Sequence, residues 1–224
     1  LMAFGQNIPP YVFEKHDKGI EIDIISAALA YKGHILKPLY FPLARIPMAF
    51  QNNQVDATMG DMGVDLKVHG GFYALPAVTY DNVFISLKSK NLSIKKPSDL
   101  DNLLVVSFQG AEKRYPAWLD KAEKEKRLFS ISNQLTQVKL LHLGRYDVVL
   151  SDRYIFRYFA KYMKSLNVLN VDDSVDEHTF TTEIPENYSP VFRDENIRDD
   201  FNFGLEKLKE SGEFQKIYDR YITL

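Results

Sequence analysis

The sequence predicts an α/β protein of two lobes, each with a mostly parallel sheet flanked by helices. Three observations lead to this prediction. Strand and helix patterns alternate over residues 19–60, and the alternation starts again after the polar, turn-rich residues 88–101. The chain then finishes with two amphipathic helices that need a sheet to cover. Such alternation is typical of largely parallel sheets that are covered on both faces.

The first lobe opens with a helix from about Gly19 to Gly33, in which apolar residues recur at helical spacing. An extended run over 35–41, a helix over 43–52 and a short apolar strand over 55–59 follow. Ligand sites of such sheets lie beyond the carboxyl ends of the strands, which is where Asp61 is expected.

The second lobe is predicted from three strands, over 83–87, 103–107 and 147–151, and from a helix that Gly110 opens. A further strand candidate over 180–184 precedes Pro185. Two apolar stripes then indicate the closing helices, at Ile197, Phe201, Leu205 and Leu208, and at Phe214, Ile217, Tyr218, Tyr221 and Ile222. Returning these helices to the first sheet gives lobe one as 1–83 plus 185–224 and lobe two as 84–184, with two crossover strands as a hinge.

The composition excludes several classes of protein. The chain has 224 residues, 45% of them hydrophobic and 26% charged, with a formal net charge of -2. A near-neutral chain offers no cationic surface for nucleic acid, and no stretch reaches the roughly 18 apolar residues that cross a bilayer. The sequence has no cysteine, its five histidines lack metal-ligand spacing, and it has no glycine-rich phosphate loop. We therefore expect no metal, no cofactor, no nucleic acid and no membrane insertion.

Five short motifs follow one another along almost the whole chain: residues 9–13 (PPYVF), 19–24 (GIEIDI), 53–57 (NQVDA), 144–152 (GRYDVVLSD) and 208–218 (LKESGEFQKIY). In order and spacing they resemble the family 3 extracellular solute-binding proteins, the periplasmic components of amino-acid ABC importers. The resemblance implies a two-lobed clamshell of the type II periplasmic-binding-protein class that closes on a small polar solute in the interlobe cleft. It also implies a monomer in the periplasm or outside the cell, whose signal peptide is absent from this sequence, with importer membrane subunits as partners.

The sequence departs from the family pattern where amino-acid binders hold the carboxylate of their ligand. The matching stretch over 62–67 has no arginine, and Lys67 is one position out of register and cannot form a bidentate fork. In the second lobe, Glu112 stands where hydroxyl residues are usual, and it would oppose an anion. Asp152 matches the position that pairs with a ligand ammonium. The resemblance therefore points to an amine-bearing, cationic or neutral polar solute rather than a plain α-amino acid.

Four residues of the first lobe are candidates for ligand contact. Tyr11 and Phe13, in the loop after the first strand, could stack on a flat part of the ligand, with core packing as the alternative. Arg45 follows a predicted strand and could meet an anionic group or form a surface salt bridge. Asp61 could face a cation or cap a helix, and helix capping is the commoner role of an aspartate there.

Five further candidates belong to the second lobe or to its junction with the first. Gln109 and Gly110 lie in a strand-to-helix turn, where an uncharged amide and a close backbone approach suit a ligand. Arg114, one turn later, faces either the cleft or water. Tyr80 contacts the ligand or fixes the crossover. Asp152 either binds a cation or caps the next helix.

Three classes of function remain open from the sequence. A binding protein for an importer is the leading hypothesis, and it requires a ligand with differential affinity for the closed state. The same fold could instead be the ligand-sensing ectodomain of a membrane signalling receptor. An enzyme related to the dehydratase branch of this fold needs an acid or base, for which Glu14, Glu112 and Glu183 are the only further carboxylates we could nominate.

Overall fold

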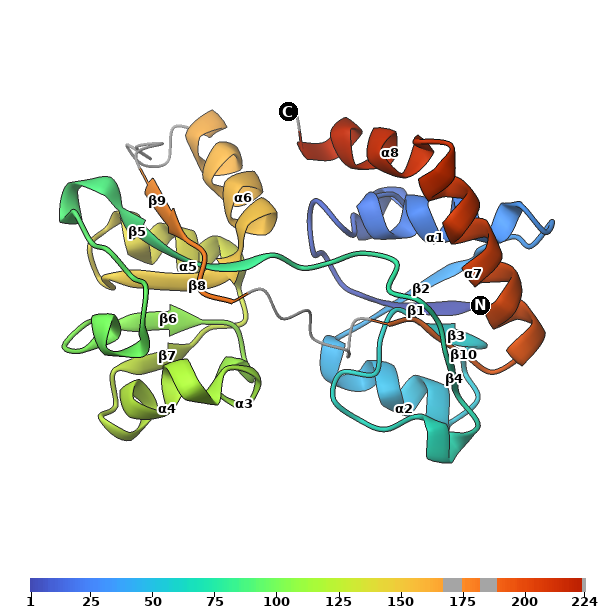
Figure 1. The fold of residues 1–224 in the computed structure, drawn as a ribbon, viewed down its shortest axis with the longest axis horizontal. Coiled ribbons are helices and arrows are strands. Elements are labelled where there is room, and N and C mark those ends of the chain that lie inside the picture. Colours follow the sequence, from blue (N-terminus) through green and yellow to red (C-terminus); the bar gives the residue numbers. More distant parts are fainter. Residues whose placement is uncertain (167–174, 182–188, 223–224) are drawn as a thin grey trace. The chain divides into compact units, whose positions relative to one another are not determined.

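The computed structural model describes residues 1–166, 175–181 and 189–222 (Figure 1). The chain divides into two compact units, Leu1–Thr79 with Ile184–Leu224, and Tyr80–Glu183. Each unit has one five-stranded sheet with flanking helices, so the prediction of two α/β lobes is confirmed. The second unit includes the whole of β5 (Asn82–Leu87), which the sequence analysis divided at residue 83, because β5 pairs along its length with β8 (Val148–Asp152).

The sheet of the first unit has the strand order β2-β1-β3-β10-β4. Strands β2 (Pro38–Phe41), β1 (Met2–Gly5) and β3 (Ala57–Thr58) are parallel. Strand β10 (Val191–Phe192) lies antiparallel between β3 and β4 (Phe72–Tyr73). The last strand of this unit in the sequence is therefore an interior strand of its sheet.

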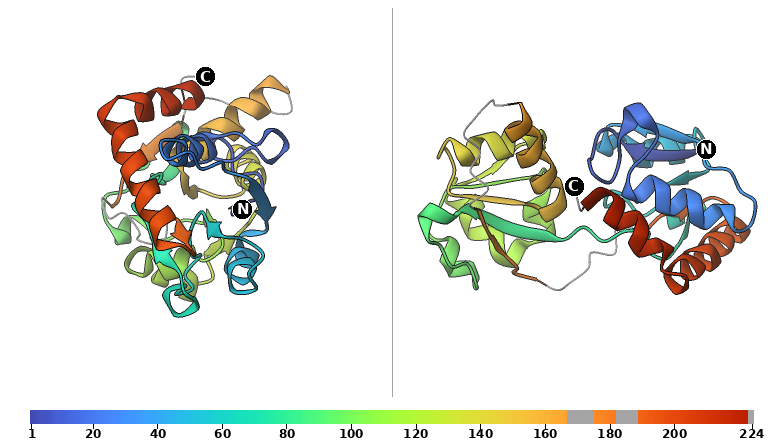
Figure 2. Two further views of the ribbon diagram at one scale, coloured as in Figure 1. Left: turned by 90° about the vertical axis from the view of Figure 1, so that its right-hand side faces the viewer. Right: turned by 90° about the horizontal axis from the view of Figure 1, so that it is seen from above.

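The helices of the first unit are α1 (Ile20–Ala30), α2 (Ile46–Gln51), α7 (Glu195–Glu210) and α8 (Glu213–Ile222). The helix expected over 43–52 is divided into a 3-10 turn, Leu43–Arg45, and α2. Further 3-10 turns are Glu14–His16 and Lys67–His69. Helices α7 and α8 pack beside α1 (Figure 2).

Two glycines allow close approaches in the first unit. A Cβ on Gly204 of α7 would lie 1.9 Å from the carbonyl oxygen of Ala28 in α1, so only glycine lets the two helices meet this closely. Gly19 has φ 135° and precedes α1, and a Cβ there would lie 2.1 Å from the carbonyl oxygen of Tyr11. That carbonyl accepts the backbone N–H of Glu21, which joins the loop after β1 to the start of α1.

The sheet of the second unit has the order β7-β6-β8-β5-β9. Strands β7 (Leu128–Ser130), β6 (Val105–Ser107) and β8 are parallel, while β5 is antiparallel to both β8 and β9 (Val175–His178). Both sheets are thus mixed, with parallel strands on one side. The strand candidate over 180–184 is wrong for Phe180 and Thr181, which follow β9 outside any strand, and its residues 182–184 lie outside the described part.

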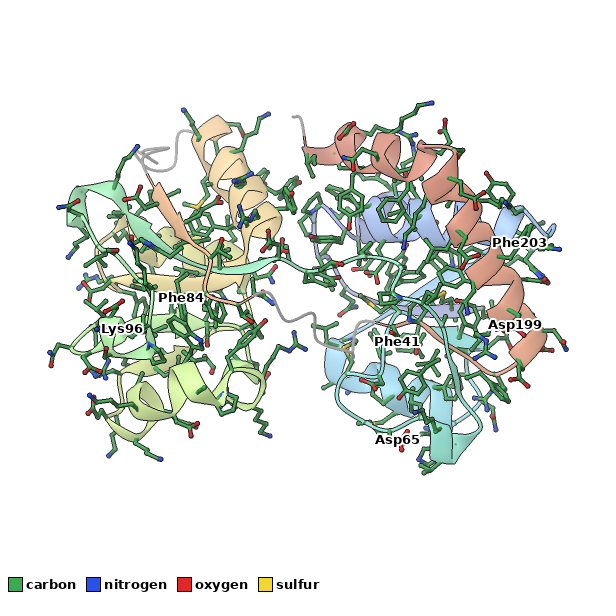
Figure 3. The ribbon with its side chains drawn as sticks, viewed as in Figure 1. Phe41, Asp65, Phe84, Lys96, Asp199 and Phe203 are labelled. Carbon is green, nitrogen blue, oxygen red and sulfur yellow. The ribbon has the colours of Figure 1, made fainter. Side chains whose placement is uncertain are left out.

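The helices of the second unit are α3 (Ala111–Arg114), α4 (Pro116–Lys124), α5 (Gln134–His142) and α6 (Arg153–Ser165), and its 3-10 turns are Lys88–Lys90 and Pro97–Leu100. The expected helix after Gly110 is interrupted at Tyr115, because Pro116 begins a new helix. Phe84 of β5 lies inside the unit (Figure 3) and packs on Trp118 and Phe180, with ring centroids 5.5 and 4.5 Å away.

Candidate functional site

The carboxyl ends of β6 and β8 lie at the same edge of the second sheet. These strands are parallel neighbours, with Ser107 opposite Leu150, so the residues that follow each strand emerge together. The loop with Gln109 and Gly110 follows β6, and Asp152 is the last residue of β8. The topology therefore brings three of the predicted site residues to one edge, where ligand sites of α/β sheets lie.

Asp152 carries a buried carboxylate, with the residue only 3% exposed. Its Oδ1 accepts the backbone N–H groups of Tyr154 at 2.9 Å and Ile155 at 3.0 Å, so it caps helix α6. Its Oδ2 accepts the backbone N–H of Asp81 at 2.6 Å. Three N–H donors and the positive end of the helix dipole favour the ionised carboxylate. The capping alternative for Asp152 is thus observed, and its role toward a ligand stays a prediction.

Two polar residues that the sequence analysis missed lie near this carboxylate. Asn82 donates through Nδ2 to the hydroxyl of Tyr115 at 3.0 Å, and both residues are buried. Burial raises the pKa of Tyr115, and the negative charges of Asp152 and Asp81 act in the same direction, against the Asn82 hydrogen bond and Arg114. The tyrosine therefore remains a neutral O–H at physiological pH. No sequence motif marks either residue, because the fold alone brings Tyr115, which lies between α3 and α4, to Asn82 in β5.

The turn after β6 combines a glycine in the left-handed region with nearby charged side chains. Gly110 has φ 85° in the left-handed region, and a Cβ there would meet nothing within 4 Å, while Gln109 is exposed. The guanidinium of Arg114 lies over the ring of Phe108, 5.6 Å from its centroid. The Oε2 of Glu112 is inaccessible and has no hydrogen-bond partner among the described residues. Anionic ligand groups are disfavoured beside that carboxylate.

Tyr11 and Phe13 have packing roles in the first unit. Tyr11 is fully buried, and its hydroxyl donates to the carbonyl of Thr79 at 3.5 Å. Phe13 stacks on Tyr221 of α8, with ring centroids 6.0 Å apart. These contacts favour the core alternative that the sequence left open for both aromatics, and their contact with a ligand stays a prediction.

Arg45, Asp61 and Tyr80 have different surroundings. Arg45 is exposed, and its guanidinium forms no hydrogen bond or ion pair within the described part of the chain, while its backbone N–H donates to the carbonyl of Pro42 at 2.7 Å. Asp61 accepts the backbone N–H of Gly63 and the hydroxyl of Tyr73, both at 2.8 Å, so it organises the turn after β3. Tyr80 is half-buried and directly precedes Asp81, whose N–H meets Asp152. Of these three, Tyr80 is thus the residue next to the edge of the second sheet at which Asp152 lies.

The stretch over 62–67 is a compact turn. Asp65 accepts the backbone N–H of Lys67 at 2.9 Å, and the Lys67 ammonium lies 5.3 Å from the ring centroid of Tyr73. Tyr73 in turn donates to Asp61. The only cation of this stretch is therefore directed at a neighbouring ring.

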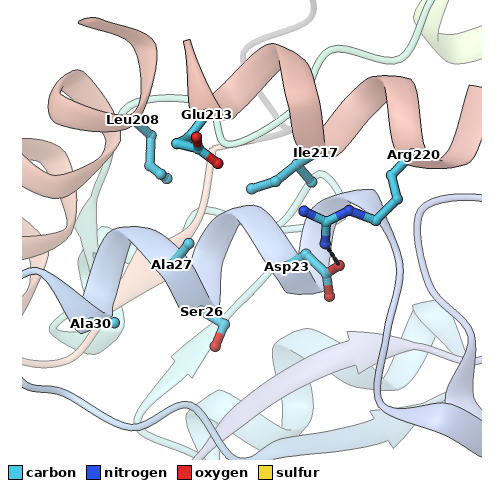
Figure 4. A pocket seen from close by; sticks show the side chains of 8 residues that line it. All are labelled: Asp23, Ser26, Ala27, Ala30, Leu208, Glu213, Ile217 and Arg220. Atoms are coloured by element: carbon cyan, nitrogen blue, oxygen red, sulfur yellow. Dashed lines mark ion pairs between the residues drawn. The ribbon is translucent and has the colours of Figure 1, made fainter. Parts of the chain in front are cut away.

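A shallow hollow on the first unit is unrelated to the predicted site residues (Figure 4). It lies along α1 and α8, and its charged lining residues include Asp23 and Arg220, which form an ion pair of 3.5 Å. Tyr221 also donates to Asp23, at 2.7 Å. The charges are thus used in packing the helices together.

Within residues 1–166, 175–181 and 189–222, no group of histidines and carboxylates could hold a metal ion. Over the same ranges, no helix is both long and apolar enough to cross a membrane.

Comparison with known proteins identifies the fold. The arginine-binding periplasmic protein of Mannheimia haemolytica is 21% identical over 226 residues, which cover 99% of this chain and 90% of that protein. An amino-acid ABC transporter substrate-binding protein from Streptococcus pneumoniae, bound to L-arginine, has a TM-score of 0.72 at 16% identity, with 100% and 93% of the two chains covered. A histidine kinase sensor domain similar to periplasmic binding proteins has a TM-score of 0.71 at 16% identity and covers 99% and 95%.

These structural likenesses establish the two-lobed fold of periplasmic binding proteins for this chain. The sequence matches a family along its whole length: the bacterial extracellular solute-binding proteins, family 3, match residues 1–224. The structure agrees with this match, because it has two mixed α/β units and the C-terminal segment completes the first of them. The chain belongs to the family 3 bacterial extracellular solute-binding proteins.

Proposed function

We propose that this chain is the solute-binding component of an amino-acid ABC importer and that it selects a solute with an amine or guanidinium group. The observation that carries the proposal is the buried carboxylate of Asp152 at the carboxyl end of β8. A carboxylate held by N–H dipoles in a protected position is suited to a charged N–H donor, because such hydrogen bonds are stronger than neutral ones.

The names of the similar proteins agree with this chemistry. The Mannheimia haemolytica relative is called arginine-binding, and the Streptococcus pneumoniae structure contains L-arginine. Arginine presents an ammonium and a guanidinium, and either group could be recognised by a carboxylate.

The composition of the stretch over 62–67 supports a site that recognises the solute through its amine end and not through its carboxylate. It provides no guanidinium for a solute carboxylate, and its Lys67 is directed at Tyr73. Glu112 in the second unit further disfavours an anion beside α3. We therefore expect an amide or ester of a cationic amino acid to bind about as well as the free acid.

Asp152→Asn tests the proposal, because asparagine can still cap α6 through its Oδ1 while it removes the negative charge and the second oxygen that accepts the Asp81 N–H. In calorimetric titrations with L-arginine, L-arginine amide, L-glutamine, 1,4-diaminobutane and succinate, we expect wild type to prefer the cationic solutes. We expect Asp152→Asn to weaken their binding at least about tenfold, which corresponds to roughly 1.4 kcal/mol.

Asp194→Asn is the matched control. Asp194 caps α7 through the backbone N–H groups of Asn196 and Ile197, at 2.8 and 3.3 Å, much as Asp152 caps α6. Its substitution should leave affinity unchanged. Preferential binding of succinate, or equal affinities of Asp152→Asn and wild type for L-arginine, would overturn the proposal.

A second candidate is the ligand-sensing ectodomain of a signalling receptor, since a histidine kinase sensor domain has the same fold. Deletion of the gene distinguishes the two. Loss of uptake of the radiolabelled solute supports the importer, whereas a changed transcriptional response to the solute with unchanged uptake supports the receptor.

A further inference from the structure

Arg153, the first residue of α6, has one guanidinium nitrogen near each of three partners. Its Nε lies 2.6 Å from Oδ2 of Asp81, as an ion pair that is not aligned as a hydrogen bond. Its Nη1 lies 3.1 Å from Oε2 of Glu177, and its Nη2 donates to the Thr179 hydroxyl at 3.3 Å. The side chain of Arg153 is 22% exposed and that of Glu177 is 15% exposed, whereas the side chain of Asp81 is 43% exposed.

The partners of Arg153 lie on the two segments by which the second unit is joined to the rest of the chain. Asp81 is the second residue of that unit and directly precedes β5. Glu177 belongs to β9, and Thr179 directly follows that strand. One side chain thus links the start of α6 to both the entering and the leaving segment.

The same contacts determine how Asp152 is held. The backbone N–H of Asp81 is one of the three donors to the Asp152 carboxylate. Arg153 binds Asp81 twice, through the ion pair and through its own backbone N–H, which donates to the Asp81 carbonyl at 3.0 Å. The position of Asp81, and with it the orientation of Oδ2 of Asp152, therefore depends on Arg153.

We propose that Arg153 is a positioning residue for solute recognition: by tying Asp81 to the start of α6, it orients the Asp152 carboxylate toward the amine of the solute. The inference rests on the proposed function of Asp152. A misplaced carboxylate makes a poorer charged hydrogen bond, because that interaction depends strongly on distance and angle.

Arg157 provides the matched control within the same helix. It forms a bidentate pair with Glu177, with Nε to Oε1 and Nη2 to Oε2 both at 2.7 Å, and its side chain is 54% exposed. It shares Glu177 with Arg153, but among the described residues it forms no hydrogen bond or ion pair with Asp81, whose charge acts on it only at longer range. Replacing Arg157 removes an ion pair of this cluster and leaves the link to Asp81 in place.

The experiment compares wild type with Arg153→Gln, Arg153→Lys and Arg157→Gln. Calorimetry with L-arginine and L-arginine amide measures the affinities, and thermal unfolding measures the stability. Amide hydrogen exchange measures how strongly the backbone N–H of Asp81 is protected. We expect Arg153→Gln to weaken both solutes at least tenfold and to speed exchange at Asp81. Arg153→Lys, which keeps the charge but not the planar fork, should recover part of the affinity. Arg157→Gln should change affinity less than twofold.

Equal affinities of Arg153→Gln and wild type, or equal losses in Arg153→Gln and Arg157→Gln, would overturn the positioning role. If Arg153→Gln does not fold, Arg153→Lys takes its place. A larger loss of affinity in Arg153→Lys than in Arg157→Gln then supports the positioning role, and equal losses contradict it. Failure of wild type to bind either cationic solute refutes the proposed function itself, which separates the two results.

Discussion

At the scale of single residues, tyrosine–aspartate pairs connect a strand to a loop and one helix to another in the first unit. Tyr73 donates to Asp61 at 2.8 Å, and Tyr221 donates to Asp23 at 2.7 Å. Burial, together with these hydrogen bonds, raises the pKa of Tyr73 and of Tyr221 to about 12, although the backbone contacts of Leu66 and Gly19 act against the rise. Both phenols thus keep their protons more tightly in the folded state than in the unfolded chain.

These pKa values predict a loss of stability in alkaline solution. Because the folded-state pKa lies above the ordinary value of 10.0, this contribution is full below pH 10 and is lost as pH rises toward 12. Denaturant unfolding at a series of pH values, with tyrosinate absorbance as a second signal, measures the decline. The double variant Tyr73→Phe with Tyr221→Phe should decline less steeply. An equal decline of stability with pH in wild type and in the double variant would contradict the role of these two tyrosines.

The role of Asp61 shows what single residues in a sequence leave open. Helix capping was the alternative predicted for Asp61 and is not observed, because Asp61 accepts the backbone N–H of Gly63 within a turn. The position of Asp61 beyond the end of β3 was predicted. Its bond to Tyr73 was not, because that contact requires the turn over 62–67 to bring β4 back toward β3. Asn82 and Tyr115 were missed for the same reason, since strand pairing places Asn82 opposite Asp152 and only the packed fold brings Tyr115 to Asn82.

At the scale of elements, the packing of α1 on α7 depends on the missing side chain of Gly204. The nearest atoms to a Cβ there are the backbone oxygen and carbon of Ala28, at 1.9 and 2.7 Å. Backbone atoms inside a packed helix pair cannot rotate away as a flexible side chain can. The two helices would have to move apart to admit a methyl group.

Gly204→Ala should therefore lower the free energy of unfolding by about 3 kcal/mol, despite the better helix propensity of alanine. Chemical denaturation monitored by circular dichroism gives this value. Lys207→Ala, at a half-exposed position of the same helix, should change it by less than about 0.5 kcal/mol. A Gly204→Ala protein as stable as wild type would show that α1 and α7 separate easily.

The elements themselves were predicted unevenly. The closing helices α7 and α8 were found because their apolar stripes match the buried positions Phe201, Leu205, Leu208 and Ile217. Helices α5 and α6 were not assigned. In α6 the residues over 153–165 alternate aromatic and basic types, and only the structure shows that Ile155, Phe156 and Met163 form its buried face.

At the scale of the whole molecule, the two units differ in continuity. The second unit is one uninterrupted segment with its own sheet and buried clusters on both faces. The first unit consists of two segments, and β4 pairs only with β10 among the described strands. The order of strands and helices along the sequence led us to expect this return of the chain. The two closing helices have no sheet of their own and therefore had to cover the first sheet.

A fragment of residues 80–183 should therefore fold alone, with cooperative unfolding in denaturant, whereas residues 1–79 alone should not. Adding residues 184–224 to the first segment through a short flexible linker should restore folding of the first unit. Circular dichroism and denaturant titration of the three polypeptides measure this. Cooperative unfolding of residues 1–79 alone would contradict the dependence of β4 on β10.

The interior position of β10 also has a consequence for the order of events during biosynthesis. A ribosome makes β1 to β4 first, then all of the second unit, and only afterwards the strand that pairs Val191 with Thr58 and Tyr73. The nascent chain thus carries an incomplete first sheet with an open edge for most of its synthesis. Such an edge is a natural target for chaperones, and it postpones completion of the native first unit until the strand at Val191–Phe192 has emerged.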